Sequence, residues 1–414
     1  MITRRVLGWT LAGAAAAATL GMSATSALAT DIVVKVGVDL PLTGAYAQGA
    51  REAENIIMMA VDEANEDHSI PGYRIEAIAY DDATSTTHQP DPVQAATNAR
   101  RMVLDKDVVA AVGPAGSGLA KAMLPILSVG NLAIVTPRAT NPDLTAPRFA
   151  AQYRPAGKTI FFRTVTTDAH QGPNMANFFT EVLKVRSVYV LDDGTAYGIG
   201  IADSFEAQAA KKGISVLGRD RLDPQASDYA AVLTKIKRLN PHALYYGGDN
   251  LAGFKLAKQS NELLPPIIRG AGDGMFSKDF LIGAGFPAAE GWYITLAQPH
   301  MNDSSQAQSF VQRCRDRIGA GVCGDNHITE YDAALVVIDA IKRVAASGSP
   351  VTRDAVRNAI QSTHLETIQG PVSFDENGDL SDRSVSVYQI RKDDSKPLDS
   401  VRDQSQYVGA APQS

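Results

Sequence analysis

Residues 32–40 read IVVKVGVDL, and residues 41–49 continue as PLTGAYAQG. The first stretch is almost wholly apolar, which is typical of a strand that is buried on both faces of a parallel sheet. An amphipathic helix follows it, because apolar residues recur there at the spacing of one helical face: Ala53, Ile56, Ile57, Ala60 and Ala64. A buried strand and then an amphipathic helix predict the start of an α/β sheet.

The same alternation continues along the chain and then restarts. In the first half, strands are predicted at 74–80, 108–112 and 132–135, and helices at 92–104 and 117–128. A second series follows the aperiodic stretch 141–158, with strands at 187–191, 214–217, 243–246, 267–268 and 292–296 and helices at 174–183, 199–212, 229–239 and 252–263. Two such series of similar size predict two lobes, each a parallel sheet covered by helices on both faces.

The order of elements changes after about Pro299. Three helices and two short strands are predicted there, at 306–318, 329–346, 352–361, 372–374 and 385–390, and the tail from Gln404 is expected to be frayed. These elements are too few for a third domain, so we expect them to complete the first two. The predicted lobes are 30–161 with 300–378 and 162–299 with 379–414, and the chain crosses between them more than once.

Length and composition exclude several classes of protein. The chain has 414 residues, 45% of them hydrophobic, which suits two globular domains. The formal net charge is −6, without the basic excess of a nucleic-acid-binding protein. The seven histidines are scattered and only two cysteines are present, so no metal site and no cofactor are expected.

The first 29 residues have the pattern of an export signal. Arg4 and Arg5 precede an uncharged, alanine-rich stretch that ends in Ala27-Leu28-Ala29, a small-x-small cleavage pattern. We expect cleavage after Ala29 and a periplasmic protein; the alternative is an uncleaved membrane anchor. The paired arginines also resemble a twin-arginine signal, and an ordinary Sec signal remains the other route. In an oxidising compartment Cys314 and Cys323 can form a disulfide; the alternative is two free buried thiols.

The stretch 112–118, VGPAGSG, leaves a predicted strand and opens a predicted helix. Unpaired amides at such a helix start attract a carboxylate or phosphate, although the same residues also suit an ordinary helix cap. No GxGxxG follows the first strand, and neither a Walker A nor a GxSxG pattern is present, so a nucleotide site and a hydrolase elbow around Ser117 are not indicated. Further polar loops follow other strands, at 136–142, 192–198, 245–249 and 270–274, and together they would surround one cleft between the lobes.

The whole chain after the signal resembles the branched-chain amino acid binding proteins, the periplasmic components of ABC importers. The resemblance rests on the order of motifs that are individually unspecific: VGVDLPLTGAYAQG, YDD at 80–82, AVGPAGSG, TPRATNPDLT, FFRTVTTDAHQGP, AYG at 196–198, LYYGGDN, GDG at 272–274, AAEGWY, EYDAALVVIDAI and GPVSFDENGDL. It implies a type I periplasmic binding fold, with two Rossmann-like lobes joined by a hinge of several crossings.

The resemblance also implies a ligand site. Ser117 and Thr140 match residues that hold an α-carboxylate, Asp273 matches the acid that pairs with the α-ammonium, and Tyr197 matches an aromatic residue that packs on the ligand. Ligand bridging the two lobes would favour hinge closure.

Three residues depart from a leucine-binding pattern and make a plain aliphatic pocket doubtful. Arg138 stands where several relatives have a small residue, and it either reaches a second carboxylate or faces solvent. Asp249 replaces an aromatic residue, and the aromatic that usually follows Gln48 is missing.

The expected function is therefore capture of an amino acid or related carboxylate, without chemistry, by a monomer that delivers it to a permease and ATPase complex. The alternatives are a sensor subunit that docks on a membrane receptor and an exported hydrolase using Ser117.

Overall fold

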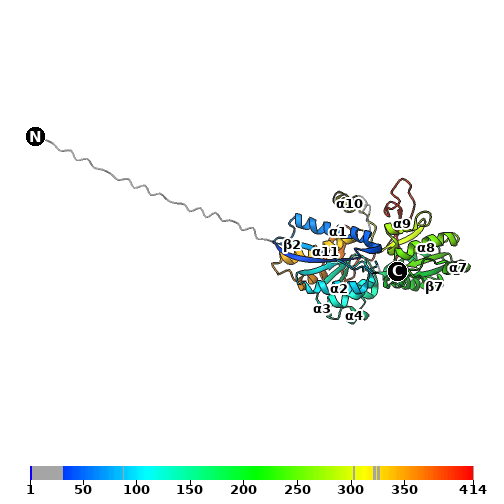
Figure 1. Ribbon diagram of the computed structural model, residues 1–414, viewed down its shortest axis with the longest axis horizontal. Coiled ribbons are helices and arrows are strands. Elements are labelled where there is room, and N and C mark those ends of the chain that lie inside the picture. The colour runs from blue at the N-terminus through cyan, green and yellow to red at the C-terminus, as the bar shows by residue number, and fades with distance from the viewer. Residues whose placement is uncertain (2–30, 87, 302–303, 320–322, 324–326, 414) are drawn as a thin grey trace. The chain divides into compact units, whose positions relative to one another are not determined.

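The computed structural model describes Met1 and residues 31–86, 88–301, 304–319, 323 and 327–413 (Figure 1). Apart from Met1, the predicted signal peptide lies outside the described residues. Within those ranges, no helix has both the length and the apolar character needed to cross a membrane.

The first sheet has five parallel strands in the order β2-β1-β3-β4-β5. The strands are β1 Ile32–Leu40, β2 Tyr73–Asp81, β3 Val108–Val112, β4 Ala133–Thr136 and β5 Phe161–Arg163. Its helices are α1 Ala47–Glu66, α2 Pro92–Leu104, α3 Ser117–Val129, α4 Ala150–Tyr153, α10 Ser305–Arg317, α11 Ile328–Ala346 and α12 Arg353–Gln361. One buried cluster joins this sheet to α1, α10, α11 and α12, and another joins it to α2 and α3, so helices cover both faces (Figure 1).

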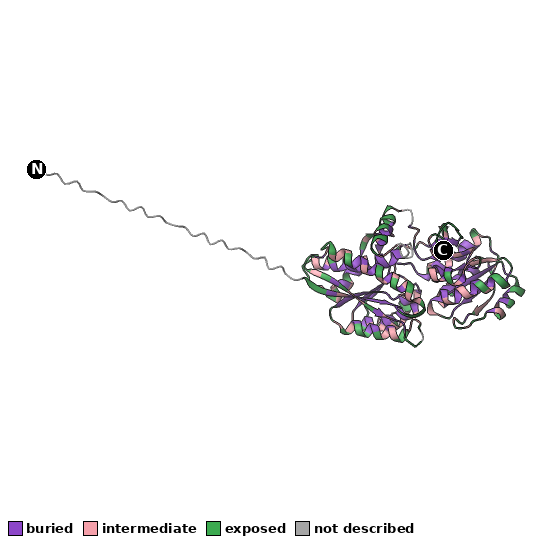
Figure 2. Cartoon of the chain, turned by 45° about the horizontal axis from the view of Figure 1, so that its top comes forward, coloured by how far each residue is buried: buried purple, intermediate pink, exposed green. Residues whose placement is uncertain are grey.

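The second sheet has seven strands in the order β14-β13-β10-β9-β8-β6-β7. The strands are β6 Ser187–Asp192, β7 Ser215–Arg221, β8 Ala243–Gly247, β9 Ile268–Ala271, β10 Trp292–Leu296, β13 Ser386–Ile390 and β14 Ser405–Ala410. The helices α5 Asp168–Glu181 and α6 Ala196–Lys211 pack on one face. The helices α7 Ala230–Leu239, α8 Asn250–Leu263 and α9 Lys278–Ala284 pack on the other. Buried residues follow the strands and the inner sides of the helices (Figure 2).

Two expectations about this sheet are wrong. The sheet is not wholly parallel, because β13 pairs antiparallel with β10. The tail from Gln404 is not frayed, because β14 pairs antiparallel with β13 and forms the sheet edge. Both strands come from the C-terminal segment, which adds them after the parallel β-α series is complete.

The remaining short elements are 3-10 turns and a small antiparallel pair. They are η1 Gly44–Tyr46, η2 Pro142–Leu144, η3 Pro147–Phe149, η4 Asp273–Met275, β11 His364–Thr367 and β12 Gly370–Ser373. Cys314, at the end of α10, and Cys323 are joined by a disulfide, with 5.8 Å between their Cα atoms.

The chain passes between the two sheets three times, after β5, after β10 and before β13. These passages are hydrogen bonded to one another: the Thr166 amide donates to the Ala297 carbonyl at 2.9 Å, and the Ser386 hydroxyl donates to the Gln298 carbonyl at 2.9 Å. This arrangement is a hinge of several crossings. The lobe boundaries inferred from sequence stay a proposal, and the one placed after residue 161 falls inside β5.

Candidate functional site

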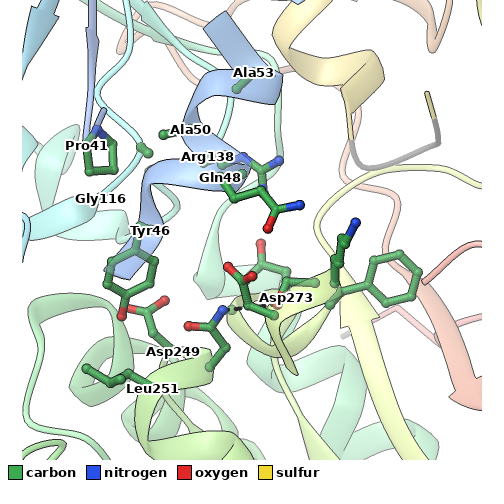
Figure 3. A pocket seen from close by; sticks show the side chains of 18 of the residues that line it. Pro41, Tyr46, Gln48, Ala50, Ala53, Gly116, Arg138, Asp249, Leu251 and Asp273 are labelled. Atoms are coloured by element: carbon green, nitrogen blue, oxygen red, sulfur yellow. Dashed lines mark hydrogen bonds between the residues drawn. The ribbon is translucent and has the colours of Figure 1, made fainter. Parts of the chain in front are cut away.

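A cavity of about 650 Å³ is lined by residues that follow strands of both sheets. Strands of the first sheet lead into Gly116, Ser117 and Arg138, and strands of the second lead into Asp193, Asp249 and Asp273. Figure 3 shows Tyr46, Gln48 and Arg138 of the first lobe on one side of the cavity and Asp249 and Asp273 of the second lobe on the other. A cavity beyond the carboxyl ends of the strands is where open α/β sheets bind ligands.

The start of α3 presents backbone amides to this cavity. The N-cap residue is Gly116. Because glycine has no side chain, it forms no capping hydrogen bond with the amides of the first turn. The Ser117 hydroxyl accepts a hydrogen bond from the Asn141 amide at 3.2 Å. A Cβ atom added at Gly118 would meet no atom within 4 Å, so this turn is open on the cavity side. Uncapped amides at the positive end of a helix suit a carboxylate.

Thr140 does not line the cavity. It is fully buried, and its hydroxyl donates to Asp168 at 3.0 Å. The structure thus brings six of the seven predicted ligand residues to the cavity, whereas Thr140, in the same loop as Arg138, is buried away from it.

Asp273 is held through its side chain and through its backbone amide. The Tyr197 hydroxyl donates to its Oδ1 at 2.6 Å, and its own amide donates to Gln171 Oε1 at 3.1 Å. The Gly274 amide donates to the Tyr197 hydroxyl at 3.1 Å, so the turn and the tyrosine hold each other.

Burial raises the pKa of the Asp273 carboxyl, and the Tyr197 hydroxyl and then the Gln171 amide counteract this. Behind it lies Asp168, whose pKa is raised first by burial and then by the charge of Asp273. Asp168 and Asp273 place two carboxyls in one poorly solvated region. A cation beside Asp273, which lines the cavity, would reduce their repulsion. Asp273 is therefore a suitable partner for an ammonium group.

Arg138 lines the cavity, and it also forms an ion pair with Glu330 of α11. The Glu330 side chain is fully buried, so this pair neutralises a charge that would otherwise be isolated in the core. Arg138 therefore lines the cavity while it is held by Glu330, and its contact with a second carboxylate of a ligand stays a prediction. Gln48 lies beside it and donates to Glu52 at 3.4 Å.

Asp249 occupies the N-cap position of α8, but its side chain makes no capping hydrogen bond. Its carboxylate faces the cavity, and its amide donates to Asp193 Oδ2 at 2.8 Å. Burial, and then the charges of Asp193 and Asp273, raise the pKa of the Asp249 carboxyl well above its usual range. The second lobe therefore brings three acids to one side of the cavity.

Several supporting residues were missed by sequence reasoning. Arg163 is fully buried and donates to the carbonyls of Ala139 and Asn141, each at 2.8 Å, which holds the loop between them. Gln171 and Glu330 support Asp273 and Arg138. All three lie in quoted motifs, but their partners are distant in sequence, and no local pattern reveals such pairing. In the described part of the chain, no three His, Cys, Asp or Glu residues are grouped as a metal ion would need.

Comparison with known proteins decides the family. A family model described as periplasmic binding protein matches residues 33–395. The chain belongs to this family. Its resemblance to branched-chain amino acid binding proteins with the type I fold is confirmed by relatives and by solved structures.

Two relatives illustrate the similarity within this family of periplasmic solute-binding proteins. A Leu/Ile/Val-binding protein homolog 3 from Brucella melitensis is 30% identical over 91% of this chain and 96% of its own length. The Leu/Ile/Val-binding protein BraC3 from Rhizobium johnstonii is 29% identical over 86% of this chain and 91% of its own.

The fold is shared with a crystal structure of a leucine binding protein, LivK, from Thermotoga maritima. The two superpose with a TM-score of 0.78 at 25% identity, over 91% of this chain and 98% of that one. The two-lobed α/β architecture predicted from the sequence is confirmed.

Proposed function

We propose that this protein is the solute-binding component of an ABC importer and that it captures an amino acid between its lobes. The observation that carries the proposal is the pairing of opposite ligand-binding chemistries across one cavity. Amides at the start of α3 suit a carboxylate, and the Asp273 carboxylate on the other lobe suits an ammonium group. The α-carbon of an amino acid joins these two groups in one small molecule.

The proposed roles follow the family resemblance. Ser117 and the amides around it bind the α-carboxylate, Asp273 binds the α-ammonium, and Tyr197 orients Asp273 and packs on the ligand. For Thr140, its hydrogen bond to Asp168 supports a positioning role in place of direct contact. The relatives named above as leucine- or Leu/Ile/Val-binding proteins support an amino acid as the ligand class.

The protein would act by binding alone. The Ser117 hydroxyl is engaged by the Asn141 amide, and no histidine contact to it is recorded among the described residues. A serine nucleophile needs a base within hydrogen-bond distance, so this arrangement favours ligand binding over hydrolysis.

The same proposal includes export and delivery. The mature protein would start at Thr30, reach the periplasm as a monomer, and dock on a permease and ATPase complex. N-terminal sequencing of the exported protein tests cleavage after Ala29.

Replacing Arg4 and Arg5 together by lysine distinguishes the export routes. A twin-arginine substrate would be retained in the cytoplasm, whereas a Sec substrate would still be exported.

A thermal-shift screen over amino acids, amides and aromatic acids, followed by calorimetry, tests the function. A ligand that binds only the native state raises the melting temperature. We expect a one-to-one complex with an amino acid, and loss of detectable binding in Asp273→Ala with its melting temperature largely kept. An unchanged affinity in that variant would exclude the proposed site.

A further inference from the structure

We propose that the preferred ligand carries a second cationic group, an ammonium or guanidinium on its side chain, and that Asp249 binds it. This inference rests on the proposed function, because it assigns Asp273 to the α-ammonium and leaves Asp249 for the side chain. It names a basic amino acid as the ligand class.

The first observation is that the Asp249 carboxylate has no partner within the described protein. Aspartate at an N-cap position ordinarily accepts hydrogen bonds from the first amides of its helix. Here the Asp249 side chain accepts none, although Asp91 at the start of α2 accepts two. No ion pair or side-chain hydrogen bond to the Asp249 carboxylate is formed by any residue in the described ranges. The side chain is instead turned into the cavity, as Figure 3 shows.

The second observation is that the surroundings of Asp249 are acidic. Asp193 is satisfied by backbone amides of two loops: its Oδ1 accepts from the Thr195 amide at 2.9 Å, and its Oδ2 accepts from the Asp249 amide at 2.8 Å. Burial disfavours a charge on Asp249, and the charges of Asp193 and then Asp273 add to this effect. Among the described residues, no basic side chain forms an ion pair with this carboxylate, so a ligand cation would stabilise its charge.

The third observation concerns the cations at the cavity. Four lysine and arginine side chains of the described residues line the cavity. Arg138 is held by the buried Glu330 carboxylate, and Lys278 forms an ion pair with Asp399 at 2.8 Å. Arg315 and Arg402 are the other two, and none of the four forms an ion pair with Asp249 or Asp193. A ligand with an extra carboxylate would add to the acids already present, whereas an extra cation would neutralise them.

The fourth observation concerns the room beside Asp249. The hydroxyl of Tyr46, from the other lobe, lies next to Asp249 in Figure 3, and Gln48 lies farther toward Asp273. Tyr46 is thus the polar residue near Asp249, and Gln48 is the polar residue nearer to Asp273. A cavity of about 650 Å³ also has room for a side chain longer than a methyl group.

Matched ligands provide the test. Lysine differs from norleucine, and ornithine from norvaline, only by a terminal amino group. Calorimetry on the exported protein should give an affinity for lysine or ornithine about tenfold or more above that for its neutral counterpart, as expected for a charge-assisted hydrogen bond. Asp249→Asn keeps the size of the side chain, and it should abolish this preference while changing the affinity for norleucine and norvaline by less than about threefold.

Asp403→Asn is the control variant. Asp403 lies on the exposed rim of the same cavity, where it contacts Ser400, so its substitution removes one negative charge without touching Asp249. The preference for the diamino acids should survive in this variant. Equal loss in both variants would mean that overall charge, and not Asp249, sets the preference.

Other outcomes separate this inference from the proposed function. The inference would be overturned if the unaltered protein bound norleucine or leucine as tightly as lysine and ornithine. The proposed capture of an amino acid would still stand in that case. Glutamine binding as tightly as lysine, with the same loss in Asp249→Asn, would assign Asp249 to a neutral donor and also overturn it. If no amino acid binds at all, both proposals fail. The comparison of ligands on the unaltered protein decides the question even if Asp249→Asn does not fold.

Discussion

At the scale of single residues, the site depends on buried charged groups that hold its loops. Arg163 is the strongest case, since it donates to two carbonyls of the loop 139–141, to Thr145 at 2.6 Å and to Asp379 at 2.8 Å. Asp379 follows the turn before the last crossing between lobes. One guanidinium thus connects the ligand loop to a distant segment of the chain.

We predict that Arg163→Met destabilises the protein by about 3 kcal/mol or more, because it leaves buried carbonyls and a carboxylate without their donor. Urea unfolding measures this. Arg148→Ala is the control, since the Arg148 side chain is 72% exposed and its ion pair with Asp143 should contribute at most about 1 kcal/mol. Equal losses in the two variants would contradict the role assigned to Arg163.

A second buried pair makes stability depend on pH. Asp39 and Asp82 are both fully buried beside each other, and Asp39 Oδ2 and both oxygens of Asp82 have no donor among the described residues. Burial raises the pKa of Asp39 to about 7, and burial together with the charge of Asp39 raises that of Asp82 to about 9. One proton shared between the Asp39 and Asp82 carboxyls explains how both can be buried while these three oxygens lack another donor.

The folded protein therefore retains protons that the unfolded chain releases above about pH 4, and its stability should fall as pH rises from about 5 to 9. In Asp39→Asn the like charge is gone, so this fall should become shallower and the variant should be more stable than the unaltered protein at pH 8. Urea midpoints at pH 5, 7 and 9 measure the slope. Asp67→Asn, at the exposed end of α1, should leave it unchanged, and an unchanged slope in Asp39→Asn would disprove the shared proton.

At the scale of elements, the start of α3 is the part of the first lobe that contacts the ligand. Gly118→Leu should keep the native stability to within about 1 kcal/mol, because Gly118 faces open space and leucine is a better helix former than glycine. Its side chain would enter the cavity, so we predict loss of ligand binding by calorimetry. Lys121→Leu, in the same helix but outside the cavity, should bind normally. Normal binding by Gly118→Leu would mean that ligand does not approach this turn.

Local sequence patterns predicted most elements but not their distant partners. The strands 32–40 and 108–112 and the helix 92–104 begin and end where the sequence places them, since apolar runs and helical spacing are local properties. The strand at Ser405–Ala410 was missed, because a short edge strand is stabilised by its pairing with β13 and has little apolar pattern of its own.

The same limit applies to the site. Six of the seven expected ligand residues line the cavity, because the loops after parallel strands meet at one sheet edge. The bond between Arg138 and Glu330 spans 192 positions in the sequence, and nothing near either residue indicates it. Sequence alone therefore could not predict that Glu330 of α11 holds Arg138.

At the scale of the whole molecule, ligand capture requires the lobes to move. The cavity is lined from both lobes, while the covalent connections are confined to three hydrogen-bonded crossings. Ligand that contacts both lobes favours the closed arrangement over the open one. We predict that saturating ligand reduces the radius of gyration measured by small-angle X-ray scattering, and that Asp273→Ala shows no such change. A ligand-bound protein with unaltered scattering would contradict closure.

The most direct measurement is a crystal structure of the exported protein with the amino acid that it binds most tightly. We predict that the ligand carboxylate accepts hydrogen bonds from amides at the start of α3 and that its α-ammonium lies within hydrogen-bond distance of Asp273. Ligand density outside this cavity, or within it but with the two ends reversed, would contradict the account.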